Sequence, residues 1–565
     1  MVGERRPPAM RRGQRRRALT RLGPLGALAA VAFAVGVIAG LGPGRAEHDL
    51  VTQYVNALAR GDYVRMYSLL DSVSKRDMSQ AQFVDDYRSA TTTATLTGLT
   101  PGRIGARTGD VIPVRMLVQT RAFGSFRALL RVPLSGSGSS AAVHFAGEVL
   151  FPGLRSGEQL SRHVSLGRRG DILASDGTPL AQGEARNSPI PQVAAQIVGK
   201  LGPIPAADAA RYAALGYPAD ARVGLFGLER IFQRQVAGTP GGTLLAGHRV
   251  LARSSPGPGQ TVTTTIDPAI ERAAIAAMRA NYAGIAAMDP RTGGLLALAG
   301  VAFSALQPPG STMKMITATA ALEAGAVKLS STFPIRTSAN IDGFNLQNAN
   351  GEACGGTFLN AFAVSCNSVF APLGAKIGGA KLVETAERFG FNHPVPIPGA
   401  AESTIPPANK IGGTLDVASS AIGQGQVQSS ALEMTEVGAT IAMRGRRPIP
   451  TLRAHARPRF VHVTSAHVAS LVQRMMIAVV QYGTGTSAQI PGVKVAGKTG
   501  TAELRNTTGP GATGGPQNTD AWFVGYAPVG APRVVVGALF PEQGAGGQTA
   551  APAVHDVLLA ALHAH

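Results

Sequence analysis

The spacing of apolar residues changes from a helical period to a strand period in the first part of the chain. Residues 50–58 place apolar side chains three and four positions apart, at Leu50, Val51, Tyr54, Val55 and Leu58, which predicts a helix with one buried face. Arg60-Gly-Asp62 interrupts that pattern, and residues 63–70 predict a second helix. Residues 93–134 then alternate, with Ile112, Val114, Met116 and Val118 on one strand face and Arg115 and Gln119 on the other. Helices followed by an antiparallel sheet predict a small α+β domain.

The second half of the chain predicts a sheet covered by helices. From residue 262 the pattern runs through strands, then helices, then strands again. Residues 497–503, 521–526 and 533–539 are strand-like, and the Gly-, Thr- and Asn-rich segment 505–519 predicts a loop between the first two. An apolar run at 550–562 predicts a final helix packed on these strands. The predicted fold is therefore α/β (α+β) and multidomain, with an antiparallel sheet flanked by helices in its last domain.

The N-terminal segment predicts a membrane anchor. Residues 1–21 hold eight arginines and one glutamate, and residues 22–41 are 20 uncharged, mostly apolar residues. That length is about what is needed to span a hydrocarbon core of roughly 30 Å. Because basic residues mark the cytoplasmic side, we expect a single pass with a cytoplasmic tail and the remaining chain outside the cytoplasm. A cleaved signal peptide is the alternative interpretation.

Composition limits the classes of function. At 565 residues the chain is long enough for about three domains. Its net charge of +20 is compatible with attraction to anionic wall polymers or lipid head groups, or with an arginine-rich solvated surface. The sequence contains no zinc-finger spacing, no base-reading basic helix, no phosphate-binding glycine loop and no histidine pair at metal-ligand spacing. We therefore predict no nucleic-acid partner, no metal and no cofactor.

Three short motifs carry the candidate chemistry. They are Ser311-Thr-Met-Lys314, Ser365-Cys-Asn367 and Lys498-Thr-Gly500, in that order. A Ser and a Lys three residues apart on a helix share one face, so the amine can reach the hydroxyl. A serine hydroxyl is a weak nucleophile that needs a nearby base. Lysine can serve once burial or a neighbouring cation lowers its pKa, whereas arginine practically cannot lose its proton.

Order and context separate these motifs from chance matches. Ser72-Val-Ser-Lys75 also fits the first pattern and Ser338-Ala-Asn340 also fits the second. Only Ser311 follows Pro308-Pro-Gly310 and opens an apolar, Ala-rich run, which is typical of the start of a helix. The single Lys-Thr-Gly lies in a strand-like run. The three motifs therefore point to one site built around Ser311.

The C-terminal half resembles the transpeptidase domain of class B penicillin-binding proteins, which cross-link peptidoglycan. Besides the motifs, the resemblance rests on Thr264-Thr-Ile-Asp267, Ala287-Met-Asp-Pro-Arg-Thr-Gly293, Ile422-Gly-Gln-Gly425 and Asp520-Ala-Trp-Phe-Val-Gly-Tyr526. Upstream, two segments resemble the linker or dimerisation module of this class. One starts at Arg169-Gly-Asp171, and the other is Gly227-Leu-Glu229. The preceding α+β pattern is similar to the nuclear transport factor 2-like domain of some class B enzymes, including low-affinity resistant ones.

The resemblance implies a division into five regions. We expect a cytoplasmic tail at 1–21, a transmembrane anchor at 22–41, a nuclear transport factor 2-like domain at 46–140, a linker module at 150–255 and a transpeptidase domain at 262–565. The domain between residues 46 and 140 has an alternative interpretation as an unrelated α+β spacer.

The resemblance also implies a role for each motif residue. Ser311 would be the nucleophile that attacks the D-Ala–D-Ala bond of a stem peptide, Lys314 its base, and Ser365 a proton relay toward Lys314 or Lys498. Asn367 would hold the substrate amide. The terminal carboxylate would be bound by the third motif and its neighbour, through Lys498, Thr499, Gly500 and Thr501. Backbone N–H groups of Ser311 and Thr501 would form the oxyanion hole.

The same resemblance implies substrates, partners and alternatives. The enzyme would act on peptidoglycan stem peptides, be acylated by β-lactams, and work beside a separate membrane glycosyltransferase, because no glycosyltransferase signature precedes the linker module. A β-lactamase, a D,D-carboxypeptidase and an inactive cell-wall scaffold are the alternatives. No Glu-x-x-Leu-Asn segment of the class A β-lactamase kind is present. Whether Cys354 and Cys366, the only cysteines, form a disulfide is left undecided by the sequence. An oxidising compartment permits a bridge, but Cys366 lies inside the second motif, where strain could misplace Ser365 and Asn367.

Overall fold

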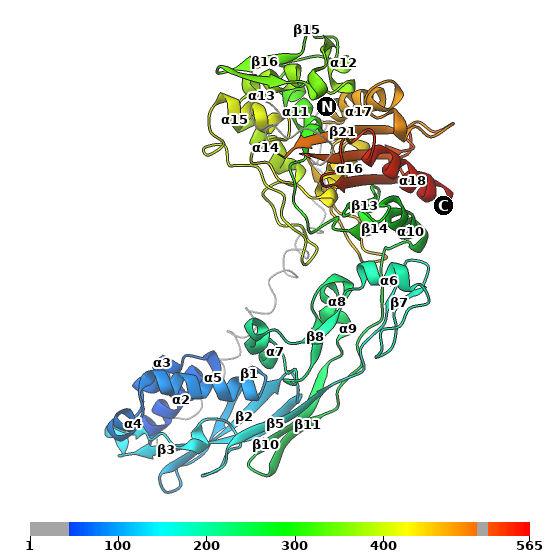
Figure 1. Ribbon diagram of the computed structural model, residues 1–565. Helices are drawn as coiled ribbons and strands as arrows, with labels where there is room; N and C mark the ends of the chain where they lie inside the picture. The colour runs from blue at the N-terminus through cyan, green and yellow to red at the C-terminus, as the bar shows by residue number, and fades with distance from the viewer. Residues whose placement is uncertain (1–43, 505–517, 565) are drawn as a thin grey trace, which may run out of the picture. The chain divides into compact units, whose positions relative to one another are not determined.

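The computed structural model describes residues 44–504 and 518–564. The predicted tail at 1–21, the predicted anchor at 22–41 and most of the predicted loop at 505–519 lie outside the described residues. Within the described part, no helix is both long and apolar enough to cross a membrane. The described residues form two compact units (Figure 1): one contains residues 44–165, Ala210–Pro218 and Pro240–Ser255, and the other contains the remaining described residues.

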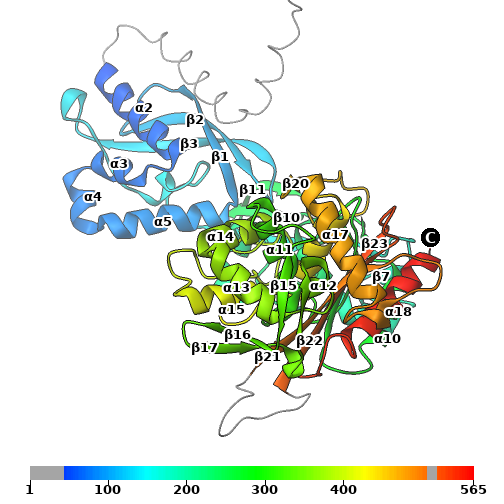
Figure 2. The same cartoon turned by 90° about the horizontal axis from the view of Figure 1, so that it is seen from above.

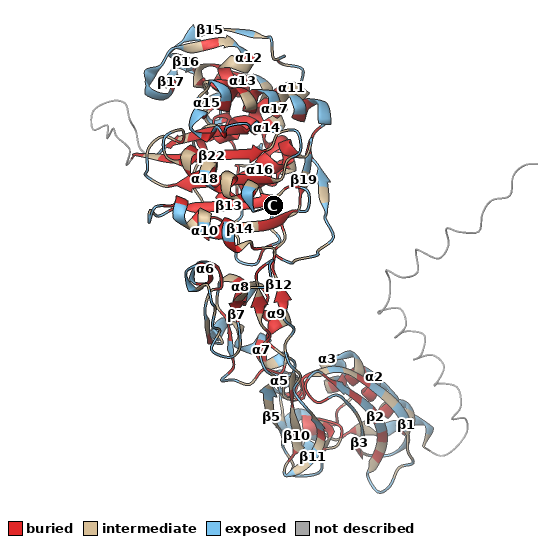
Figure 3. Cartoon of the chain, turned by 90° about the vertical axis from the view of Figure 1, so that its right-hand side faces the viewer, coloured by how far each residue is buried: buried red, intermediate tan, exposed pale blue. Residues whose placement is uncertain are grey.

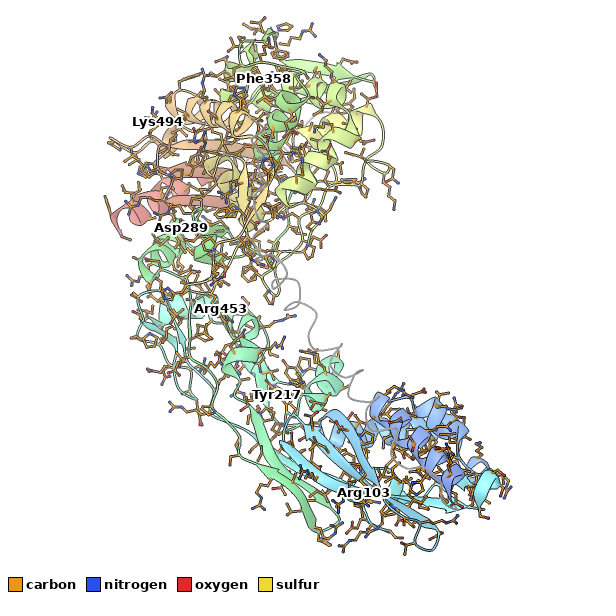
Figure 4. All side chains as sticks on the ribbon, turned by 180° about the vertical axis from the view of Figure 1, so that it is seen from behind. Arg103, Tyr217, Asp289, Phe358, Arg453 and Lys494 are labelled. Carbon is orange, nitrogen blue, oxygen red and sulfur yellow. A yellow bond between two sulfur atoms is a disulfide. The ribbon has the colours of Figure 1, made fainter. Side chains whose placement is uncertain are left out.

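The smaller unit is the predicted α+β domain. Its helices are α2 (Arg45–Arg60), α3 (Tyr63–Ser68), α4 (Ser72–Asp77) and α5 (Gln80–Thr93). An antiparallel sheet follows in the order β1 (Leu96–Ile104), β2 (Val111–Thr120), β3 (Ser125–Ser135) and β4 (Ala142–Val143). Figure 4 labels Arg103 on β1. The alternation predicted along β2 is confirmed, because Ile112, Val114, Met116 and Val118 are buried while Arg115 and Gln119 are exposed.

The predicted linker region does not fold as one body. The order β11-β10-β5 forms a second sheet of the smaller unit, from β5 (Leu160–Leu166), β10 (Pro240–Ala246) and β11 (Arg249–Ser254). Leu244 and Ala246 of β10 are buried in the same core as Val114 of β2. Residues 166–209 and 219–239 belong instead to the larger unit. The two units are therefore not divided at residues 150 and 255. The β10–β11 hairpin packs in the smaller unit, although it comes after residues that belong to the larger one.

The part of the linker region in the larger unit is held by a buried ion-pair cluster. Its elements are β6 (Ile172–Leu173), β7 (Pro179–Ala181), α6 (Pro191–Ile197), β8 (Leu201–Pro203), β9 (Arg222–Gly224), α8 (Gly227–Ile231) and α9 (Gln233–Val236). The carboxylate of Glu229, 1% exposed, accepts hydrogen bonds from Arg169 Nε at 2.8 Å and Arg186 Nε at 2.6 Å. The two segments that carried the linker resemblance are therefore joined directly. β12 (Val262–Thr263) pairs in parallel with β6 and leads into the last domain.

A five-stranded antiparallel sheet forms the centre of the larger unit. Its order is β14-β13-β23-β22-β21, from β13 (Gly284–Asp289), β14 (Gly294–Gly300), β21 (Ala496–Glu503), β22 (Thr519–Ala527) and β23 (Val534–Phe540). The three strands predicted near the C-terminus are confirmed to within two residues. Asp289 and Lys494, which lie at the end of β13 and just before β21, are labelled in Figure 4.

Helices cover both faces of this sheet, as predicted. On one face α10 (Pro268–Ala277) and the predicted final helix, α18 (Ala550–His563), pack against alternate strand residues such as Ile285 and Phe523. The opposite residues, such as Trp522 and Val524, face a core shared with α16 (Ala431–Ala442) and α11 (Lys314–Glu323). In Figure 3 the strands are almost wholly buried between these layers.

A helical region adjoins the sheet and completes the unit. It contains α12 (Phe358–Ala363), α13 (Asn367–Ile377), α14 (Gly379–Phe389), α15 (Thr414–Ala421) and α17 (Ala466–Gln481). Short strands lie beside it: β15 (Thr332–Arg336), β16 (Ser338–Ile341), β17 (Phe344–Gln347), β18 (Cys354–Thr357), β19 (Arg446–Pro448) and β20 (Phe460–His462). Figure 2 shows α11 among α12, α13, α14 and α17, with the β16–β17 hairpin at the rim. All three motifs meet where this region adjoins β21.

Candidate active site

The first motif begins in a tight turn. Residues Gly310–Met313 form a 3-10 helix, and α11 starts at Lys314, one turn later than a simple helical run would place it. Gly310 has φ +51° and its N–H donates to Gly423 O at 2.9 Å. A Cβ at Gly310 would lie 2.7 Å from Thr501 O. Glycine is therefore required for the turn to approach β21 closely enough to place Ser311 beside that strand.

The second motif lies in the loop between α12 and α13, close to the first. Ser365 has φ +64°, a backbone conformation that non-glycine residues adopt rarely. The turn is held by Ser365 N–H donating to Phe362 O at 3.1 Å and Cys366 N–H donating to Ala361 O at 2.8 Å. Cys354 and Cys366 are joined by a disulfide. The question left open by the sequence is thereby answered, and the bridge ties β18 to the middle residue of the motif.

Lys314 and Lys498 meet around one hydroxyl group. Lys314 Nζ donates to Ser365 O at 2.7 Å and lies 3.4 Å from Ser365 Oγ. Lys498 Nζ donates to the same Oγ at 2.9 Å and to Thr499 O at 3.0 Å. Both lysine side chains are fully buried. The Ser365 hydroxyl is thus placed between two amines, as a proton relay requires.

Burial makes both lysines weak bases. Burial, and then the charge of Lys498, hold the pKa of Lys314 well below its usual range. Burial also lowers the pKa of Lys498, to about 7. Among the described residues neither ammonium has a carboxylate partner; each instead faces an aromatic ring, Lys314 that of Phe370 at 5.4 Å and Lys498 that of Phe362 at 5.5 Å. Removing water without adding a counter-charge favours the neutral amine, which is the form that can accept a proton.

The structure places Asn367 against Lys314. Its Oδ1 accepts a hydrogen bond from Lys314 Nζ at 2.7 Å, and its Nδ2 donates to Gln347 O of β17 at 2.9 Å. Both ends of the amide are therefore occupied by the protein. The second N–H of Nδ2 has no partner among the described residues, so it remains available to a substrate amide, as the sequence predicted.

The third motif lies on an edge strand. Lys498, Thr499, Gly500 and Thr501 pair with β22, in the register Lys498↔Val524 to Thr501↔Ala521. β21 is last in the sheet order, so its other edge is free to pair with an extended peptide. The first motif packs against one face of this strand, since a Cβ at Gly500 would point out of the sheet and come within 2.7 Å of Pro309 O. The Thr501 hydroxyl accepts a hydrogen bond from Gly546 N–H at 3.3 Å.

Among the described residues no hydrogen bond joins Ser311 to its predicted base, Lys314. The Ser311 side chain is half-buried, and within the described part of the chain its hydroxyl has no hydrogen-bond partner. Lys314 Nζ is directed to Ser365 and Asn367 instead. The role of Lys314 as the base of Ser311 stays a prediction; the two residues lie at the junction of the 3-10 helix and α11. In free enzymes such catalytic contacts often form only when the substrate is bound.

Neither chance match contains a buried lysine. Ser72 is the first residue of α4 in the smaller unit, where Lys75 Nζ donates to Ser68 O at 2.9 Å. Ser338 and Asn340 lie on β16, where Ser338 pairs with Gln347, the residue whose carbonyl accepts from Asn367. The second chance match therefore lies beside the site without belonging to the lysine pair. Sequence reasoning missed Phe362 and Phe370, the rings that face the two lysines, because their spacing on α12 and α13 indicates only a core position. Phe358, the first residue of α12, is labelled in Figure 4.

Three family models match the chain in the predicted order. They are the penicillin binding protein transpeptidase domain at residues 283–559, the penicillin-binding protein dimerisation domain at 175–249 and the NTF2-like N-terminal transpeptidase domain at 46–108. The matched ranges fall inside the regions predicted at 262–565, 150–255 and 46–140.

Characterised relatives and solved structures agree with these models. The peptidoglycan D,D-transpeptidase PbpA of Mycolicibacterium smegmatis is 32% identical over 369 residues, 54% of this chain and 73% of the relative. PbpA of Mycobacterium tuberculosis is 32% identical over 372 residues, with the same shares. The structure of the D,D-transpeptidase domain of a peptidoglycan glycosyltransferase from Eggerthella lenta superposes with a TM-score of 0.58 at 28% identity, covering 71% of this chain and 99% of that one. A ceftriaxone acyl-enzyme complex of M. tuberculosis penicillin-binding protein A gives a TM-score of 0.57 at 26% identity, covering 70% and 98%.

Proposed function

The chain belongs to the penicillin-binding protein transpeptidases, and from this premise we propose how its own residues carry out the reaction. It is a serine-type peptidoglycan D,D-transpeptidase. The observation that carries the assignment of residues is the Ser365 hydroxyl held between Lys314 and Lys498, beside the free edge of β21. No other buried lysine pair with a shared hydroxyl occurs among the described residues.

In the first half-reaction Ser311 attacks the carbonyl of the D-Ala–D-Ala bond. The Ser311 Oγ–C bond forms, the C–N bond to the terminal D-alanine breaks, and the serine proton passes to Lys314. Ser365 gives its hydroxyl proton to the departing amine and takes the proton now on Lys314, whose Nζ lies 3.4 Å from its Oγ, so Lys314 is neutral again. The product is an acyl-enzyme and free D-alanine.

In the second half-reaction an amine of a neighbouring stem peptide attacks the acyl-enzyme. Its nitrogen forms the new amide, the Ser311 Oγ–C bond breaks, and the proton lost by the amine returns to Ser311 through Lys314. The neutral form of Lys314 that burial favours is required at both steps, since a protonated amine cannot act as a base.

The third motif binds the substrate while these steps occur. Lys498, Thr499 and Thr501 recognise the terminal carboxylate, and Gly500 lets the first motif lie against the strand. Backbone N–H groups of Ser311 and Thr501 stabilise the oxyanion; losing one such donor typically costs about 10²–10³ in rate. β-Lactams enter the same site and leave an acyl group on Ser311, as the ceftriaxone acyl-enzyme of the M. tuberculosis relative suggests by analogy.

A covalent adduct tests this assignment. After incubation of the full-length protein with benzylpenicillin, mass spectrometry of a tryptic digest should locate the adduct on the Ser311 peptide and leave the Ser72 peptide unmodified. Ser311→Ala should abolish labelling, while Ser72→Ala serves as the matched control. An adduct absent from Ser311 after long exposure to high drug would overturn the proposal.

We further propose that residues 22–41 anchor the enzyme in the cell membrane in a single pass, with the catalytic domain outside the cytoplasm. The arginine-rich tail supports this orientation, and the Cys354–Cys366 disulfide suits an oxidising compartment. A reporter active only outside the cytoplasm, fused after residue 150, should be active; activity only of a cytoplasmic reporter would contradict the topology.

The partner that polymerises the glycan is proposed to be a separate membrane glycosyltransferase. This follows from the absence of a glycosyltransferase signature before the linker region. Cross-linking of the full-length protein in membranes, followed by affinity purification, should recover such an enzyme. Recovery of no glycosyltransferase, under conditions in which a known membrane complex survives, would count against the proposal.

A further inference from the structure

The segment that joins β17 to β18 contains one buried residue whose role the motifs do not explain. Gln347 ends β17 and Cys354 begins β18. Of residues 347–353 only Asn348 is buried, with 5% of its surface exposed. The β16–β17 hairpin that precedes it lies at the rim of the unit (Figure 2). A buried amide in an otherwise exposed segment indicates that its side chain holds something in place.

The side chain of Asn348 joins three separate segments. Its Nδ2 donates to Arg336 O at 2.7 Å, at the end of β15, and to Glu352 O at 2.9 Å. Its Oδ1 accepts a hydrogen bond from Ser368 N–H at 2.8 Å, in the first turn of α13. An amide side chain has two N–H donors and one oxygen acceptor. Both donors and the acceptor are therefore used by the protein, and none is left for a ligand.

The bond to Ser368 caps α13 from a distant segment. The first N–H groups of a helix have no partner within the helix and are usually satisfied by the side chain of the N-cap residue. The N-cap residue of α13 is Cys366, and it makes no such bond. Asn348, 20 positions earlier in the chain, supplies the missing acceptor. The start of α13 is thus fixed by the segment that follows β17.

This arrangement fixes the backbone on both sides of Asn367. The residue before it, Cys366, is bound covalently to Cys354. The residue after it, Ser368, is bound to Asn348. Both ties lead to the segment between β17 and β18, so Asn367 is held between two anchored neighbours.

The same segment also orients the Asn367 side chain. The carbonyl of Gln347, the residue next to Asn348, accepts a hydrogen bond from Asn367 Nδ2 at 2.9 Å. Because a carbonyl oxygen can only accept, this bond turns Nδ2 toward β17 and leaves Oδ1 to accept from Lys314 Nζ. The position of the Gln347 carbonyl therefore decides which way the amide faces.

We propose that Asn348 is a positioning residue of the acylation reaction. By fixing the Gln347 carbonyl against the start of α13, it orients the Asn367 amide, which holds the amine of Lys314 and presents its second N–H to the substrate amide. Asn348 itself does not touch the substrate. This inference rests on the proposed function, because the contact between Asn367 and a substrate amide belongs to that function.

A ratio of two acylation rates tests the proposal. Benzylpenicillin carries an amide side chain, and 6-aminopenicillanic acid carries a free amine at the same position. In the full-length protein Asn348→Ala should lower the ratio of their second-order acylation rates about tenfold, since a hydrogen bond to the amide is lost. Partial unfolding would lower both rates equally and leave the ratio unchanged. Asn345→Ala, at an exposed asparagine of β17, is the matched control and should leave both rates unchanged.

A double-mutant cycle tests the route through Asn367. Asn367→Ala removes the amide that Asn348 is proposed to orient, so in that background Asn348→Ala should lower the ratio no further. A further tenfold fall would show that Asn348 acts independently of Asn367 and would overturn this route.

Hydrogen–deuterium exchange measures the cap without reference to acylation. Asn348→Ala should accelerate exchange of the peptide that contains Ser368. Asn348→Asp keeps an oxygen that can accept from Ser368 N–H, so its exchange should remain close to that of the wild-type protein. Faster exchange in Asn348→Asp, equal to that in Asn348→Ala, would refute the cap.

The proposal is overturned if Asn348→Ala leaves the ratio of rates unchanged, if Asn345→Ala lowers it equally, or if exchange at Ser368 is the same in Asn348→Ala and the wild-type protein. Absence of acylation in the wild-type protein is a different result, which refutes the proposed function. Exchange at Ser368 would in that case still decide whether Asn348 holds the start of α13.

Discussion

Two pairs of like charges are buried in the larger unit, and they differ in how far the protein satisfies them. In the motif site the amines of Lys314 and Lys498 both find oxygen acceptors at 2.7–3.0 Å. On α16 the buried Glu433 and Glu436 each leave one carboxylate oxygen unpaired. Burial acts against charge in both places, lowering the pKa of the lysines and raising that of the glutamates.

The difference shows that burial of two like charges has different consequences at the two places. The lysine pair is held by hydrogen bonds that leave one amine able to accept a proton, so the protein alone supplies the environment that chemistry requires. In the glutamate pair one oxygen of each carboxylate has no hydrogen-bond partner, so burial is not compensated there. The lysine pair and the glutamate pair both have shifted pKa values, and they differ in whether their polar atoms have hydrogen-bond partners.

The largest expected effect comes from making one lysine permanently charged. Lys314→Arg should lower the second-order rate of acylation by benzylpenicillin by roughly 10³-fold, because a guanidinium cannot act as the base. Lys498→Arg should retain a measurable rate, since a guanidinium can also attract a carboxylate. Stopped-flow measurement of both purified variants decides it. Equal rates for the two would show that Lys314 is not the base.

The glutamate pair should instead appear in the pH dependence of stability. Glu433 has its pKa raised to about 7 in the folded protein, above an unfolded value of about 4.3. The stabilisation is therefore complete below the unfolded pKa and is lost as pH rises toward 7, by on the order of 3 kcal/mol. Urea unfolding between pH 4 and 8 should show this decline, and Glu433→Gln should reduce its slope, with the buried Glu436 accounting for what remains. Glu402→Gln, at an exposed glutamate of the same unit, is the control; an unchanged slope in Glu433→Gln would refute the assignment.

A pH profile of acylation sharpens the comparison from the lysine side. Because the pKa of Lys498 is about 7, its positive charge is lost as pH rises through that value, and recognition of the carboxylate should weaken, by about tenfold per pH unit at the limit. Lys498→Arg should remove this alkaline decline, because a guanidinium stays charged. The measurement is the acylation rate at pH 6 to 9. A decline that persists unchanged in Lys498→Arg would assign it to another group.

The smallest change in acylation rate is expected in the chance match on α4, where Lys75 has no second lysine beside it. Ser72→Ala, in the chance match on α4, should change acylation by less than about twofold, since a surface substitution outside a buried network is nearly neutral. The acylation rate of Ser72→Ala against the wild-type protein measures it. A large loss would mean that the smaller unit takes part in the reaction.

Local patterns were sufficient for the elements and for the choice of reacting residues. The period-two alternation predicted the buried face of β2, and the apolar runs near the C-terminus predicted β21, β22, β23 and α18. This worked because the spacing of apolar side chains follows from which face of a strand or helix is buried. The order of the three motifs distinguished Ser311 from Ser72. These features depend on neighbours in the chain, so a sequence contains them.

Partners brought together from distant parts of the chain were decided only by the tertiary structure. The left-handed backbone at Ser365, the bond from Asn367 to Gln347, the Cys354–Cys366 bridge and the return of β10 to the smaller unit each depend on segments that are separate in sequence. The same holds for Glu433 and Glu436, whose lack of partners is visible only once Arg447 and Gly390 are in place. Charge and spacing are properties of the chain, but burial and hydrogen-bond satisfaction are properties of its packing, and these decide which buried charged groups have partners and which protonation state each one favours.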